Sequence, residues 1–137
     1  MVNFMTRILL ASVLFLETVA CEAQTFACQY SASGGLDWRS GQWESTQFKT
    51  SEPFFLTIAP DKGITSFKGD SIMERLPLNC DKKARELKIH SCSSGAGAFV
   101  YFWEATQRGA ISKLFGSVME KDERDSLSVQ PFICQKI

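Results

Sequence analysis

The sequence has little of the chemistry that enzymes and metalloproteins use. Its 137 residues include one histidine, His90, and no Cys-x-x-Cys pair, so metal binding has few ligands available. It has no P-loop, dinucleotide-binding, His-Glu-x-x-His or Gly-x-Ser-x-Gly motif. His90 lies in the polar phase of an alternating stretch, so we expect it to face solvent. We therefore expect no enzymatic activity, no cofactor and no metal site.

Carboxylates are present, but they carry little information. Asp37, Glu44, Glu104 and Glu120 could supply the acid and base of a glycoside hydrolase. Any chain of this size offers such pairs, so a small hydrolase is the least favoured alternative.

The sequence also has no excess of charge of either sign. Fifteen basic and fifteen acidic side chains give a net charge of zero, and hence no electrostatic reason to bind nucleic acid or an anionic membrane. The apolar run Ile8–Leu16 ends at Glu17, well short of the roughly 20 residues that a membrane-spanning helix needs. We expect neither a nucleic-acid partner nor a transmembrane segment.

The N-terminus does have the pattern of a secretory signal peptide. Arg7 gives a basic start, Ile8–Leu16 the apolar middle, and Ala20 and Ala23 the small residues for cleavage. Cleavage after Ala23 would leave a soluble protein in the periplasm or outside the cell. Cleavage after Ala20 would instead place Cys21 first, where a lipid anchor is a minor alternative.

The cysteines fit export. With residues 1–23 as the signal peptide, residues 24–137 are long enough for one domain. This domain keeps four cysteines, an even number typical of small exported proteins with disulfides. Four cysteines allow three pairings. We prefer Cys28–Cys134, which would join the first and last strands, and Cys80–Cys92, which would close one connection; metal binding is the weaker reading.

Short apolar or alternating stretches recur about every ten residues between turn signals. They cover residues 26–30, 43–48, 53–59, 64–68, 86–92, 98–104, 111–119 and 127–134. This spacing predicts an all-β domain, a small antiparallel meander of about seven or eight strands that forms a barrel or a sandwich.

Two segments are candidate binding surfaces. Trp38 and Trp43 flank a Gly/Ser-rich turn, where they could anchor a partner or stack on sugar rings, or else fold back as lids on the barrel ends. Further along, Phe99, Tyr101 and Trp103 share one face of a strand whose other face is also apolar. Such a strand is either central and covered on both sides, or its aromatic face contacts a partner.

A family resemblance follows from this second region. Ser94-Gly95-Ala96, Tyr101, Trp103, Arg108-Gly109-Ala110 and Leu114 resemble the Ser-Gly-Ala-x-Tyr and Trp-x-Lys-Gly-x-x-Ala-x-Leu motifs of bacterial periplasmic inhibitors of C-type lysozyme. Four residues separate Trp103 from Arg108, where the family motif has one. That family consists of small exported β-barrels, and the resemblance implies that Ser94 and Arg108 would enter the cleft of a lysozyme.

A second resemblance covers the N-terminal half. Thr25-Phe26-Ala27-Cys28-Gln29-Tyr30, Gly35-Leu36-Asp37-Trp38 and Pro53-Phe54-Phe55-Leu56 are similar to a group of small exported bacterial β proteins of unassigned activity.

We therefore expect an exported binding protein, with a lysozyme-like enzyme or cell-wall glycan as its partner. The binding residues would be Trp38, Trp43, Ser94, Tyr101, Trp103 and Arg108. The alternative is a lipocalin-like carrier whose barrel encloses a small apolar ligand.

Overall fold

The computed structural model describes residues 22–114 and 125–137. The expected lipid site at Cys21, the candidate carboxylate Glu120 and nearly all of the expected signal peptide lie outside these residues, as does the end of the strand expected over 111–119. The domain is all-β, as the sequence predicted, with 58% of residues in strands and 8% in helix.

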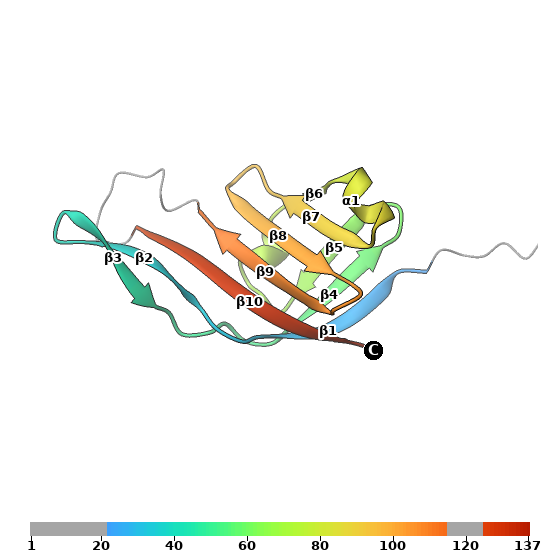
Figure 1. Cartoon of the computed structure of the whole chain (residues 1–137), viewed down its shortest axis with the longest axis horizontal. Helices are drawn as coiled ribbons and strands as arrows, with labels where there is room; N and C mark the ends of the chain where they lie inside the picture. Colours follow the sequence, from blue (N-terminus) through green and yellow to red (C-terminus); the bar gives the residue numbers. More distant parts are fainter. Residues whose placement is uncertain (1–21, 115–124) are drawn as a thin grey trace, which may run out of the picture.

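Eight strands form a nearly closed antiparallel barrel. In chain order they are β1 (Gln24–Tyr30), β4 (Phe54–Ala59), β5 (Gly63–Lys68), β6 (Asn79–Cys80), β7 (Ile89–Ser93), β8 (Ala98–Trp103), β9 (Arg108–Lys113) and β10 (Ser126–Lys136). Each pairs with the next, except β5 and β6, and β10 returns to pair with β1. The predicted meander is therefore confirmed, with one seam between β5 and β6 (Figure 1).

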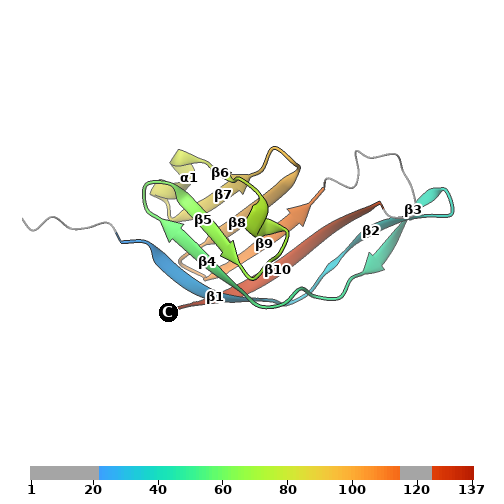
Figure 2. The same cartoon turned by 180° about the vertical axis from the view of Figure 1, so that it is seen from behind.

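The remaining two strands, β2 (Gly34–Arg39) and β3 (Gln42–Gln47), form an arm that projects from the barrel (Figures 1 and 2). β10 is long enough to serve both parts, because its first residues pair with β2 and its later residues with β1. Ser40 and Gly41 connect β2 to β3, and both have positive φ, at 50° and 81°. Two such residues give the tight turn that suits a two-residue hairpin.

Two short helical segments lie between the strands. A 3-10 turn (Met73–Arg75) begins where Asp70 Oδ1 accepts hydrogen bonds from the backbone N–H groups of Ile72 and Met73. Helix α1 (Lys82–Glu86) is capped by the side chain of Asp81, which accepts from the N–H of Ala84. Neither segment, nor any other helix in the described ranges, is long and apolar enough to cross a membrane.

The core lies inside the barrel, and phenylalanine is its most frequent residue. Alternation along the strands turns Phe26, Phe54, Phe102 and Phe132 inward, each at most 2% exposed. Their rings contact one another: Phe132 lies 5.3 Å from Phe54 and 6.0 Å from Phe102, centroid to centroid. Gly109 makes this possible, since a Cβ there would lie 2.4 Å from the ring of Phe132.

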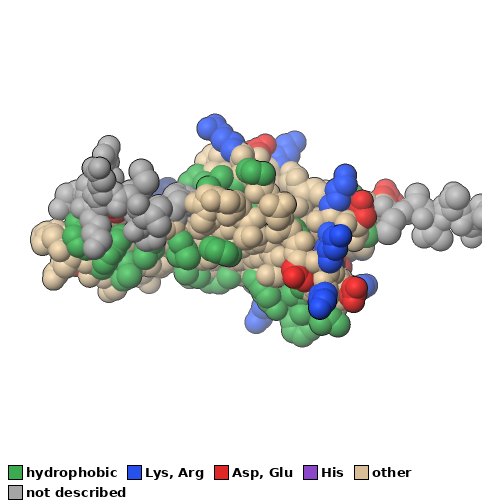
Figure 3. Space-filling model, turned by 90° about the horizontal axis from the view of Figure 1, so that it is seen from above, with side chains coloured by type: hydrophobic (Ala, Val, Ile, Leu, Met, Phe, Trp, Pro, Cys, Tyr) green, Lys and Arg blue, Asp and Glu red, His purple; other side chains and the backbone are tan. Residues whose placement is uncertain are grey.

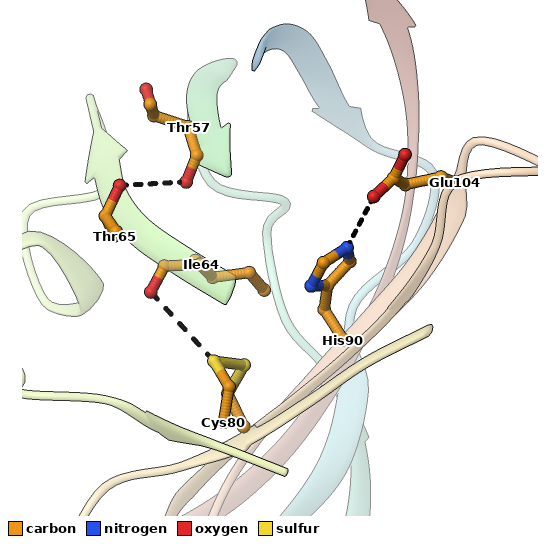
Figure 4. The surroundings of a disulfide bond; sticks show 7 residues. Thr57, Ile64, Thr65, Cys80, His90 and Glu104 are labelled. Atoms are coloured by element: carbon orange, nitrogen blue, oxygen red, sulfur yellow. Dashed lines mark hydrogen bonds and ion pairs between the residues drawn. A yellow bond between two sulfur atoms is a disulfide. The ribbon is translucent and has the colours of Figure 1, made fainter. Parts of the chain in front are cut away.

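Both predicted disulfides are present. Cys28 and Cys134 stand directly opposite each other on β1 and β10, so their disulfide joins the first and last strands. Cys80 and Cys92 are likewise opposed on β6 and β7, next to the seam, where Cys80 reaches toward the backbone of Ile64 (Figure 4). Two disulfides indicate an oxidising compartment.

The expectation that His90 faces solvent was wrong. The alternation assigned to residues 86–92 is broken, because Glu86 ends α1 and β7 begins only at Ile89. His90 is therefore inward, opposite Phe102 and 3% exposed. Its Nε2 lies 2.7 Å from Oε1 of Glu104, which makes burial of the ring tolerable (Figure 4).

Candidate binding surface

Strand β8 presents aromatic side chains on the outside of the barrel. Phe99, Tyr101 and Trp103 are 48%, 52% and 43% exposed, whereas the alternate residues Ala98 and Phe102 are fully buried. The strand is therefore apolar on both faces, but only one face is covered by the described residues. This settles where the three rings lie: at the surface, in a row.

The neighbouring strands extend this row into a broad surface. On β9, Arg108 stands opposite Trp103 and the small Ala110 stands opposite Tyr101. One strand further, β10 places Ile133 beside Arg108 and Pro131 beside Ala110. Residues that stand opposite each other in a ladder lie on the same face of the sheet, so these side chains are neighbours on the outer face of the barrel.

We call this surface the outer apolar face. It consists of the β8 aromatics, the exposed β10 side chains and the β9 residues between them: Phe99, Tyr101, Trp103, Arg108, Ala110, Ser112, Val129, Pro131 and Ile133. Val129 and Ile133 are 49% and 45% exposed. A contiguous exposed apolar surface on a folded protein is typical of an interaction site.

A hollow of about 560 Å³ adjoins this face at Ile133. It lies over β1, β4 and β10, with Phe55 and Ile133 supplying apolar walls and the amides of Gln29, Gln107 and Gln135 supplying polar groups. This size and mixture of groups suit a small ligand or one large side chain of a partner.

The arm continues the same side of the sheet. Leu36 of β2 pairs with Leu127 of β10, which has the same outward phase as Val129. Two residues along, Trp38 stands opposite Trp43, with ring centroids 5.3 Å apart and planes at 73°. The two tryptophans thus pack on each other on the arm, not as lids on the barrel, and both predicted surface segments share one side of the sheet.

Figure 3 shows how charged and hydrophobic side chains are distributed on the side of the molecule seen from above. Most charged side chains visible from above lie at the end of the barrel away from the arm, while hydrophobic side chains are exposed over the arm and along the barrel. The opposite side of the arm is polar, because Asp37 pairs with Glu44 there and Arg39 binds Asp37 at 2.8 Å.

The structure brings three of the six expected binding residues together: Tyr101, Trp103 and Arg108. Trp38 and Trp43 lie apart from them on the arm. Ser94 differs, because it is 7% exposed and its Oγ accepts a hydrogen bond from the N–H of Ala98 at 3.1 Å. Its hydroxyl shapes the turn between β7 and β8 and does not point to solvent.

The sequence analysis missed a buried polar cluster at the inner wall of the barrel. Asp70 accepts a hydrogen bond from the hydroxyl of Tyr30 at 2.5 Å and pairs with Lys113 Nζ at 3.4 Å. Burial raises the pKa of Asp70, but the Met73 N–H, the Tyr30 hydroxyl and the charge of Lys113 outweigh it and hold that pKa below its usual value. Burial and the adjacent carboxylate raise the pKa of Tyr30 well above its ordinary value. The sequence did contain one signal for this cluster: Lys113 stands at an inward-facing position of β9, where an apolar residue is expected.

The described residues offer few other side chains for catalysis or metal binding. His90 and Glu104 form a pair, but the imidazole is buried and its Nδ1 has no hydrogen-bond partner among the described residues. Within the two described ranges, no group of three or more His, Cys, Asp or Glu side chains is placed to hold a metal ion.

No protein family, curated protein or solved structure matches this chain. Its function is therefore inferred from the geometry of its surfaces.

Proposed function

We propose that this is an exported binding protein, released to the periplasm or cell exterior by a signal peptide, and that its outer apolar face engages the partner. The observation that carries the proposal is the row of three aromatic side chains on β8, each at least 43% exposed. Keeping such rings in water lowers stability or solubility without benefit unless a partner covers them.

The composition of the face favours a protein partner. Tyr, Trp and Arg are the residue types most enriched among binding hot spots, and Tyr101, Trp103 and Arg108 lie side by side here. A side chain of the partner could fill the hollow beside Ile133. Lysozyme-type or other envelope-directed enzymes are the first partners to test, because the resemblance to lysozyme inhibitors covers these same three residues.

A carrier function receives less support. The lipocalin-like alternative needs space inside the barrel, yet the described interior holds the contacting rings of Phe26, Phe54, Phe102 and Phe132. The hollow of about 560 Å³ lies on the outside of the barrel wall instead.

The test is a pull-down of the purified, folded protein with immobilised C-type lysozyme and, separately, with cell-wall glycan. We expect retention on the lysozyme, since the hot-spot residues suit a protein surface. Retention on the glycan alone would assign the aromatic row to sugar stacking. If neither material retains protein shown to be folded by circular dichroism, the proposal fails.

A further inference from the structure

Strand β3 forms an open edge of the sheet. Within the described parts of the chain, β3 pairs only with β2, while β2 is held between β3 and β10. The β2–β3 ladder runs from Gly34–Gln47 to Arg39–Gln42 without a register shift. An uninterrupted edge of this kind exposes a row of backbone donors and acceptors.

The hydrogen-bond phase identifies which backbone groups face outward. The N–H of Phe48 donates to the carbonyl of Ser33 at 3.0 Å, so that pair is a hydrogen-bonded one. Because bonded and non-bonded pairs alternate in an antiparallel ladder, Thr46 and Glu44 also bond toward β2. The N–H and C=O groups of Trp43, Ser45 and Gln47 therefore point away from β2.

The edge has few of the usual devices against strand pairing. Residues 42–47, Gln-Trp-Glu-Ser-Thr-Gln, contain no lysine, no proline and only one charge, Glu44. Ser45 and Gln47 are exposed, and the arm carries the strand away from the barrel (Figures 1 and 2).

The strand is complementary to itself in one antiparallel register. If Ser45 stands opposite Ser45 of a second copy, Glu44 stands opposite Thr46 and Trp43 opposite Gln47, and all three outward residues form ladder bonds. The register centred one residue earlier would oppose two Glu44 carboxylates, which is unfavourable. A dimer interface about a two-fold axis requires a surface that is complementary to itself. Binding of a foreign peptide has no such requirement.

We propose that two copies of this protein associate through antiparallel pairing of β3 with β3, centred on Ser45, so that the two arms form one continuous sheet. On one side of that sheet the Trp38–Trp43 pairs of both copies would flank Ser45. This association does not depend on the partner of the outer apolar face.

Analytical ultracentrifugation of the purified exported protein over a wide concentration range tests the proposal. We expect a reversible monomer–dimer equilibrium. Ser45→Pro should weaken the dimer by at least about tenfold, because it removes two ladder hydrogen bonds per dimer. The matched control Ser45→Ala keeps the backbone N–H and should dimerise as the unaltered protein does.

Cross-linking gives a second measurement that does not need the proline variant to fold. Ser45→Cys should form an intermolecular disulfide under mild oxidation, since opposed residues of a bonded antiparallel pair lie about 5.5 Å apart at Cα. Glu44→Cys should cross-link more slowly, because its opposite residue is Thr46. A protein that stays monomeric at every concentration, or a dimer in which position 45 does not cross-link in preference to 44, overturns the proposal.

Discussion

At the scale of single residues, the most consequential group is the carboxylate of Asp70. It is 4% exposed and joins three parts of the chain, since it binds Tyr30 of β1, Lys113 of β9 and the first turn of the 3-10 segment. A buried charge is tolerated only when it is paired and hydrogen-bonded, as this one is. Loss of the carboxylate would leave Lys113 buried without a counter-ion.

Asp70→Asn should lower the free energy of unfolding by about 2–4 kcal/mol, because it leaves one charge of a buried pair uncompensated. Urea denaturation monitored by fluorescence measures this change. The exposed Asp61→Asn serves as the control and should change stability little. Equal stability of the Asp70 and Asp61 variants would show that the cluster contributes nothing.

The same carboxylate should give the protein a sensitivity to acid. Its folded pKa lies below the unfolded value of about 3.9, so its contribution to stability is complete above that pH and is lost as the pH falls through the folded pKa. Unfolding free energies measured at a series of pH values below 5 should therefore fall more steeply for the unaltered protein than for Asp70→Asn. Parallel curves would contradict the assignment.

At the scale of elements, the arm depends on a cross-strand pair. Trp38 and Trp43 occupy a non-hydrogen-bonded position of the β2–β3 ladder, where opposed side chains approach most closely. An edge-to-face aromatic contact there contributes about 1 kcal/mol beyond the area it buries. The arm has few other sources of stability, because most of its residues are exposed or half-buried.

Trp43→Ala should loosen the arm while leaving the barrel intact. We expect faster hydrogen exchange at the Phe48 amide, which bonds across the hairpin to Ser33, and unchanged protection in β8. Gln47→Ala, at the other end of β3, is the control. If Trp43→Ala changes hydrogen exchange by the same factor in the arm and in the barrel, the arm is not a separate unit.

The strands that the sequence revealed are those that form short apolar or alternating runs between turn signals. β1, β4 and β8 were predicted nearly to the residue because Phe26, Phe54 and Phe102 mark their buried faces. β2 was missed because Gly34 and Gly35 begin it and are turn formers in isolation; in the structure the absent Cβ of Gly35 leaves room for the backbone of Leu127. Only the long-range pairing with β10 makes that segment a strand.

The candidate site was predictable only in part. The sequence could not show that Tyr101 and Trp103 are exposed, because their strand is apolar on both faces. Which face is buried depends on the elements that pack against the strand. Ser94 looked accessible in a Gly-rich segment, yet the return of β8 buries it. His90 was misplaced since the helix over residues 82–86 changes the phase of the strand that follows.

At the scale of the whole molecule, the two disulfides act on chain loops of very different length. Cys28–Cys134 closes a separation of 106 residues and Cys80–Cys92 one of 12. On the chain-entropy model these loops are worth about 4–5 and about 3 kcal/mol respectively.

Replacing Cys28 and Cys134 by serine should therefore destabilise the protein more than replacing Cys80 and Cys92. Guanidinium denaturation of the two double variants gives the comparison. A larger loss for the Cys80/Cys92 variant would mean that the seam, rather than the closure between β1 and β10, limits stability.

Binding by the outer apolar face is the central claim, and the dissociation constant for C-type lysozyme, measured by isothermal titration calorimetry, tests it most directly. The Tyr101→Ser/Trp103→Ser variant should bind at least about 30-fold more weakly, as loss of 2 kcal/mol or more at a hot spot implies. Ile72→Ser, which removes an equally exposed apolar side chain outside this face, should bind as the unaltered protein does. Equal affinity of all three proteins, or no binding by any of them, would contradict the account.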